Sequence, residues 1–176
     1  MRWTYACHEA GHAVAALLLG RGAYYATLEP GDGTNGHVGI PELFRRQFGA
    51  SQYGRPFGAR DRQRVAAQAV VFLAAPAAEE LLTGRYDPIG ASGDIAAAEF
   101  LLADYFYLDG AGASQRLGEL AGFADHLVHA HRDRVKRVAD ALDEQTYVGR
   151  SALKQLVFDA PDVARPLRLP SSLYRR

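Results

Sequence analysis

Cysteine is almost absent from this sequence, which excludes one way of building a small fold. The chain of 176 residues contains a single cysteine, Cys7. One cysteine excludes an intramolecular disulfide framework and any metal site made of several thiolates. The fold must therefore be held by an apolar core, for which 48% of hydrophobic residues is sufficient material.

The sequence also lacks an excess of charge and a long apolar run. Twenty Lys and Arg side chains balance twenty Asp and Glu side chains, so net charge gives no argument for a nucleic acid or an anionic membrane as partner. An apolar run such as Ala13–Leu19 is far shorter than the roughly 20 residues of a spanning helix, and the first residues do not have the pattern of a signal peptide. We therefore expect a cytoplasmic protein with no membrane segment in this chain.

Hydrophobic periodicity predicts a mainly α fold with a small β-sheet (α+β). Strand patterns at 24–28 and 37–40 suggest a hairpin or the beginning of a small sheet, and 41–60 is expected to be mostly a mobile loop. We expect one domain over 1–160 and a C-terminal tail over 161–176. Helices are expected at 4–19, at 61–82 with Pro76 kinking or dividing it, at 94–106, at 115–144 as one helix or two in tandem, and at 151–157.

The clearest chemical signal is the H-E-x-x-H pattern of His8, Glu9 and His12 inside the first predicted helix. Histidines four residues apart lie one turn apart on the same face, so both imidazoles can reach one metal ion. Imidazole pairs of this kind suit Zn²⁺. Glu9 projects close to that ion, where a general base for a metal-bound water is needed. A carboxylate on an otherwise apolar helix is costly without such a role.

A catalytic zinc site usually has three protein ligands and an open fourth position, so a third ligand is expected elsewhere in the chain. Asp94 stands at the predicted start of a helix, where the helix dipole favours the ionised carboxylate that a metal requires. The residues alone favour Asp94 over Glu79 without excluding Glu79. The full set of candidates is Glu79, Glu80, Asp94, His37 and the group His126, His129 and His131.

Three motifs, in this order, resemble the peptidase domain of the FtsH-type ATP-dependent zinc proteases. They are H-E-A-G-H-A at 8–13, A-A-E-E-L at 77–81 and G-A-S-G-D-I at 90–95. The resemblance extends over residues 4–158 and includes a turn at 146–149. It implies a zincin-like active-site helix followed by a C-terminal helical bundle.

The resemblance also implies roles for individual residues. Asp94 matches the third zinc ligand of that family, beside His8 and His12, and Glu79 matches a residue that would orient a ligating imidazole. The chain departs from the family at Gly93, where asparagine is usual, and at Pro76, where a basic residue is common. No G-x-x-x-x-G-K-[ST] nucleotide loop occurs in the sequence, so ATP-driven unfolding by this chain is not expected.

These features together predict a zinc-dependent endopeptidase that hydrolyses unfolded or flexible polypeptides without its own ATPase. Glu9 would take a proton from the metal-bound water and return it to the leaving nitrogen. One alternative is a non-catalytic relative that keeps the metal for folding and binds or regulates a partner. A hydrolase of small amides would share the same site residues. A homo-oligomer is compatible with the sequence.

Two weaker features have two interpretations each. Six arginines and four aromatic residues are interleaved between positions 44 and 64. This mixture can stack on single-stranded nucleic acid, but a solvated loop is the simpler interpretation, and we expect no nucleic-acid partner. The strand at 37–40 is either an ordinary hairpin strand or a sheet edge that pairs with an extended peptide.

Overall fold

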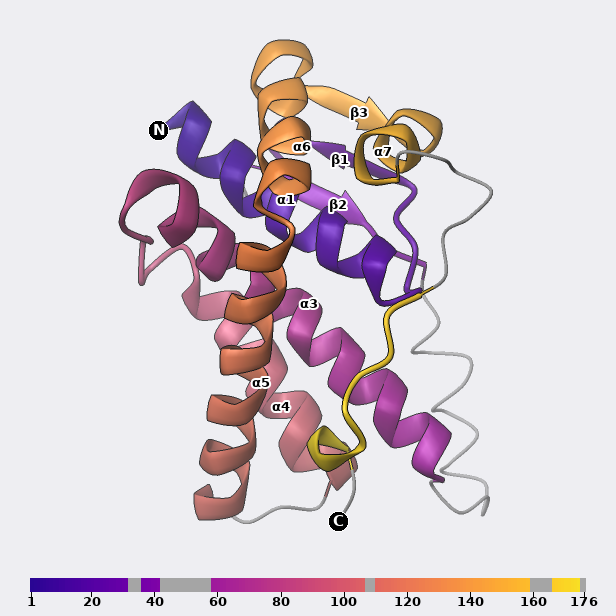
Figure 1. The fold of residues 1–176 in the computed structure, drawn as a ribbon. Coiled ribbons are helices and arrows are strands. Elements are labelled where there is room, and N and C mark those ends of the chain that lie inside the picture. The colour runs from indigo at the N-terminus through magenta and orange to yellow at the C-terminus, as the bar shows by residue number, and fades with distance from the viewer. Residues whose placement is uncertain (32–35, 42–57, 107–109, 159–165, 175–176) are drawn as a thin grey trace.

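The structure is a computed structural model that describes residues 1–31, 36–41, 58–106, 110–158 and 166–174 (Figure 1). Within these residues the protein is mainly helical, with one small three-stranded antiparallel sheet. This confirms the predicted fold class. Residues 42–57, which make up most of the predicted loop at 41–60, lie outside the described residues, and Ala59 already belongs to a helix.

Helix α1, Arg2–Leu18, runs through the middle of the molecule (Figure 1). It begins two residues before the predicted start, and it is followed by Gly20 with a φ of 70°, a left-handed conformation that glycine adopts at little cost. From Ala13 onward every residue of the helix is buried. The all-round apolar second half therefore forms the centre of the core, packed between helix α3, Ala59–Thr83, and helix α6, Arg132–Gln145.

The contact between α1 and α3 is unusually close because position 11 has no side chain. A Cβ on Gly11 would overlap the carbonyl oxygen of Ala74 and would lie 2.8 Å from the Cβ of Ala78. Small residues on both helices thus let the two backbones approach each other. This contact places the H-E-x-x-H turn of α1 directly against α3.

Pro76 does not divide α3, which is one continuous helix. A proline removes one helical N–H donor, but Pro76 lies within a buried, alanine-rich stretch whose packing against α1 maintains the helix. By length and composition alone α3 could cross a membrane, and most of its apolar stretch is buried inside the domain. Its apolar character is accounted for by its place in the core.

The sheet consists of β1, Tyr25–Thr27, β2, His37–Gly39, and β3, Tyr147–Gly149, in the order β2-β1-β3. Both pairs are antiparallel, and Ala26 stands opposite residues of both neighbouring strands. The β1–β2 pair confirms the predicted hairpin. The segment that the resemblance assigned to a turn at 146–149 instead contributes β3. In the part of the chain that is described, β2 is an edge strand.

The C-terminal half is helical, as expected. The predicted stretch at 115–144 is two helices in tandem, because the chain leaves helical geometry at His131, with φ −118° and ψ 26°. The helices of this half, besides α6, are α4, Ser92–Phe106, α5, Gly110–Ala130, and α7, Arg150–Val157, with a short 3₁₀ helix η3 at Ser171–Leu173.

The segment predicted as a C-terminal tail, 161–176, packs on the domain where it is described. The side chains of Leu169 and Leu173 are buried in the core. The backbone N–H of Leu167 donates a 2.7 Å hydrogen bond to the carbonyl of Leu18, at the end of α1. Residues 166–174 therefore contribute to the same core as the rest of the domain.

Replacing Gly11 with alanine should destabilise the fold by at least about 2 kcal/mol, because the added methyl group overpacks a backbone contact. Chemical denaturation measures this change. Gly122→Ala is the matched control: Gly122 lies on α5, and a Cβ added there would meet nothing within 4 Å, so alanine should raise helix stability by about 0.5–1 kcal/mol. A Gly11→Ala protein as stable as the parent would contradict the close approach of α1 and α3.

Candidate metal centre

One cleft brings together the residues that the sequence singled out. Its volume is about 890 Å³, and it is lined from α1, β2, α3, α4 and the segment 84–91, here called the α3–α4 loop. His8, Glu9 and His12 line the cleft from α1, and Asp94 lines it from the first turn of α4. Positions more than 80 residues apart in the sequence therefore face the same space.

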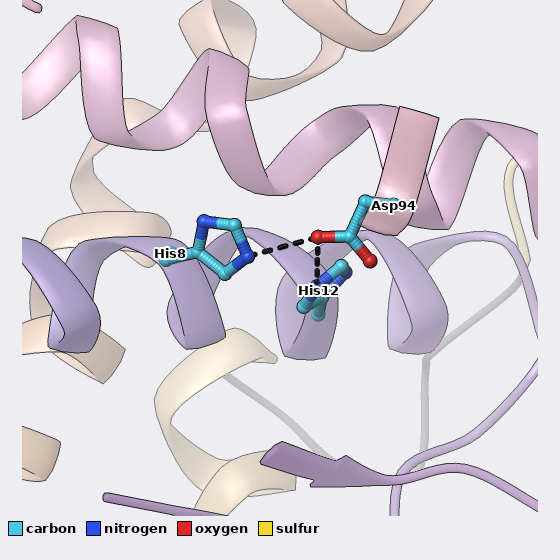
Figure 2. Close-up of side chains that lie close together, drawn as sticks. All are labelled: His8, His12 and Asp94. Carbon is cyan, nitrogen blue, oxygen red and sulfur yellow. Dashed lines mark hydrogen bonds and ion pairs between the residues drawn. The ribbon is translucent and has the colours of Figure 1, made fainter. Parts of the chain in front are cut away.

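The side chains of His8, His12 and Asp94 converge (Figure 2). Asp94 Oδ2 lies 2.9 Å from His8 Nε2 and 3.3 Å from His12 Nε2, and one ligand atom from each of the three residues lies within 4.8 Å of the others. Ligand atoms at about 2.0–2.1 Å from a tetrahedral metal ion are roughly 3.3 Å apart. The three residues can therefore hold a single metal ion.

The charges of these side chains also fit a cation site. Burial by itself would raise the pKa of Asp94, but hydrogen bonds from His12 and His8 outweigh it and hold the pKa well below its usual range. Burial would lower the pKa of His12, but its hydrogen bond to Asp94 and the charge of that carboxylate raise the pKa to about 9. An ionised carboxylate here holds a proton on the neighbouring imidazole, and a metal ion would replace that proton.

The second nitrogen of each imidazole has a partner that orients the ring. His12 Nδ1 lies 2.9 Å from the carbonyl oxygen of Val71 on α3. His8 Nδ1 lies 3.4 Å from Oε2 of Glu79, which is also on α3 and is buried. When Nδ1 donates a proton to such an acceptor, Nε2 is left unprotonated and free to bind a metal. Both Nε2 atoms are directed at Asp94.

Glu79 connects the imidazole of His8 with the wall of the cleft. Its Oε1 accepts a 2.7 Å hydrogen bond from the backbone N–H of Asp87 in the α3–α4 loop. Both carboxylate oxygens of Glu79 are thus used, one by a candidate metal ligand and one by the loop. Glu79 thus lies on the Nδ1 side of the His8 ring, and Asp94 lies on the Nε2 side.

Glu9 lies beside the three ligands and its side chain is buried. Its side chain lines the cleft and is only 7% exposed, and its Oε2 has no hydrogen-bond partner in the described part of the chain. Burial raises the pKa of Glu9, while the charges of His12 and His8 act in the opposite direction. On its other side, a Cβ on Gly36 would lie 3.1 Å from Glu9 Oε1, so the start of β2 confines the carboxylate.

The other sequence candidates do not join the ligand group in the described part of the chain. Glu80 is exposed and does not line the cleft. His37 lines the cleft from β2, but its Nε2 pairs with the hydroxyl of Tyr25 at 3.0 Å. The histidines at the end of α5 and just beyond it, His126, His129 and His131, do not line the cleft.

Sequence reasoning missed the backbone groups that complete the site. The carbonyl of Val71 and the N–H of Asp87 orient a ligand and its partner, and neither depends on the identity of the residue that carries it. Gly36 ends a turn-rich segment of the sequence, where a glycine has an ordinary explanation. Its approach to Glu9 is a contact between distant parts of the chain, so no local sequence signal marks it.

No protein-family model and no curated protein matches the chain. Its function must therefore be inferred from the residues and their geometry. A group of two imidazoles and one carboxylate, with a buried acid beside it, is the observation that any function must explain.

Replacing Asp94 with alanine should abolish tight metal binding, because it removes one of three ligands. With Zn²⁺ as the titrant we expect the affinity to fall by more than about a hundredfold, more than the loss of a residue that only orients a ligand. Calorimetric titration and metal analysis measure this. Asp133→Ala is the control, since Asp133 also lies in the first turn of a helix but outside the cleft. Equal metal content in Asp94→Ala and the parent would move the third ligand elsewhere, with Glu79 next in line.

Replacing Glu79 with glutamine should weaken metal binding by roughly 10- to 100-fold without abolishing it. Glutamine keeps the shape of the side chain but has one acceptor oxygen, so it cannot accept from both His8 and Asp87. The same titration measures the effect. Glu80→Gln, at the exposed neighbouring position, should bind the metal as the parent does. An unchanged affinity in Glu79→Gln would show that Glu79 does not orient His8.

Proposed function

We propose that this protein is a zinc-dependent endopeptidase that hydrolyses unfolded or flexible polypeptides. The single observation that carries the proposal is the placement of His8, His12 and Asp94 around one point, with the buried carboxylate of Glu9 beside them on an open cleft. Structural metal sites are usually closed by four protein ligands, whereas catalytic sites keep a position open. Three ligands and an adjacent acid are the composition of a hydrolytic site.

Zinc is the metal that the donor set and its surroundings favour. Two imidazole nitrogens and one carboxylate oxygen are common ligands of Zn²⁺. The same donors also bind Fe²⁺ in oxygenases, but oxygen chemistry does not call for a carboxylate base beside the ligands. Glu9 therefore favours hydrolysis. Metal analysis of the protein purified without added metal distinguishes the two ions.

When bound, zinc would act as a Lewis acid that polarises a peptide carbonyl and lowers the pKa of water. The protein's own residues supply the proton transfers. The Glu9 carboxylate accepts a proton from the attacking water, and the resulting carboxylic acid gives it to the nitrogen of the departing amine. Burial, which raises the pKa of Glu9, favours a carboxyl group that can hold this proton between the two steps.

The neighbouring sheet supports a polypeptide as substrate. Strand β2 lines the cleft and pairs with β1 on one side only within the described residues. The backbone groups on its other side can pair with an extended peptide, which gives affinity without demanding a particular side chain. An open cleft with such an edge suits short peptides, unfolded tails and flexible loops.

The resemblance to the peptidase domain of FtsH-type proteases supports the same function. We propose a relationship to that family on the three motifs at 8–13, 77–81 and 90–95. Each motif contributes to the site: His8 and His12 come from the first, Glu79 from the second and Asp94 from the third. The sequence contains no nucleotide-binding loop. Hydrolysis by this chain alone would therefore act on polypeptides that are already accessible.

Replacing Glu9 with glutamine should lower the rate of hydrolysis of unfolded casein by about 10²–10⁴-fold, the usual contribution of a general base. Metal content should remain that of the parent, because Glu9 is not one of the three ligands. Cleavage is followed by release of labelled fragments from the zinc-loaded proteins. If the parent and Glu9→Gln are equally inactive but both unfold when the metal is removed, the non-catalytic, metal-stabilised alternative is favoured instead.

A further inference from the structure

The α3–α4 loop is a rigid turn fixed to the metal centre. The N–H of Asp87 donates to buried Glu79 at 2.7 Å, and the N–H of Ile89 donates to the Asp87 carboxylate at 3.0 Å. The N–H of Ala91 donates to the carbonyl of Asp87 at 2.9 Å, and the hydroxyl of Ser92 donates to the carbonyl of Ile89 at 2.6 Å. These bonds hold the backbone of residue 89 from both sides.

This rigid turn presents large apolar side chains to solvent. Ile89 is 85% exposed and Tyr86 is 39% exposed, and both line the cleft that contains the metal centre. Turns of this kind are normally made of small and polar residues. An isoleucine held on a hydrogen-bonded turn is available for contact at little further cost in entropy, because its backbone is already ordered.

The apolar lining continues on other parts of the cleft. Val38 and Ile40, in and after β2, also line it and are half-buried. Glu79 joins the loop to His8, so the distance between Ile89 and the reacting centre is fixed by the fold. A ligand with apolar side chains can contact this lining while its backbone lies at the metal centre.

We propose that Ile89 and Tyr86 form an apolar docking surface for unfolded polypeptide segments that carry leucine, phenylalanine or similar side chains. Folded proteins bury most such side chains in their cores, so the surface selects segments that have lost or never had a fold. The biological meaning of this surface, substrate selection, rests on the proposed endopeptidase function. The docking itself requires no hydrolysis.

Binding is therefore tested with a protein that does not turn over, the zinc-loaded Glu9→Gln variant. The probes are two labelled, unstructured peptides: one carries leucine and phenylalanine in a glycine–serine background, and the other has serine in their place. Fluorescence anisotropy should show tighter binding of the apolar peptide. Adding Ile89→Ser should weaken that binding by roughly tenfold, as expected for partial burial of one aliphatic side chain, and should leave the serine peptide unaffected. Ile89→Leu should retain the preference.

The matched control is Phe100→Ser, which removes another exposed apolar side chain, 64% exposed on α4 and outside the cleft lining. It should bind both peptides as Glu9→Gln does. The docking proposal is wrong if Ile89→Ser leaves the affinity for the apolar peptide unchanged, or if Phe100→Ser lowers that affinity equally. This holds even where the parent protein cleaves peptides. Conversely, a parent protein that cleaves neither peptide contradicts the endopeptidase, while a selective loss of binding in Ile89→Ser still supports the docking surface.

Discussion

The contact of the Asp94 carboxylate with the imidazoles of His8 and His12 is the interaction on which the site depends. It joins the first turn of α4 to two successive turns of α1. The buried side chains of Glu9 and Glu79 lie close by, so the site gathers three carboxylates. A proton on His12, whose pKa is raised to about 9, offsets part of this negative charge, and a divalent cation offsets more. Proton and metal therefore compete for the same place.

A close helix contact at Gly11, next to His12 in the sequence, helps to set the geometry of these ligands. Gly11 allows the backbone of α1 to approach α3 at Ala74. His12 is the next residue on α1, and Val71 lies about one turn before Ala74 on α3. The close approach thus brings the Val71 carbonyl to hydrogen-bonding distance from His12 Nδ1. The lack of a side chain at Gly11 thus helps to orient His12 with Nδ1 toward Val71 and Nε2 toward the candidate metal position.

Local patterns predicted the fold class and the core of the site. The spacing of His8 and His12 on a helix predicts two ligands of one metal ion, and a helix start at Asp94 favours an ionised carboxylate there. The resemblance to a family implies the role of Glu79. Features made by distant contacts were not predictable. These include the third strand, the packing of residues 166–174 and the approach of Gly36 to Glu9. At Pro76 packing outweighs the low helix propensity of proline, and α3 stays continuous where it is buried against α1.

The burial and the hydrogen bonding of Glu9 distinguish a catalytic site from a metal site that only supports the fold. A metal held by His8, His12 and Asp94 would connect the first turn of α4 to α1 whatever residue occupied position 9. Among the described residues Glu9 Oε2 has no hydrogen-bond partner, and burial of such a polar group is unfavourable for stability. An alanine or leucine there would remove that cost and leave the three ligands in place. The cost is explained if the carboxylate exchanges a proton with a water molecule in the cleft, which requires an oxygen that no other group of the protein has engaged.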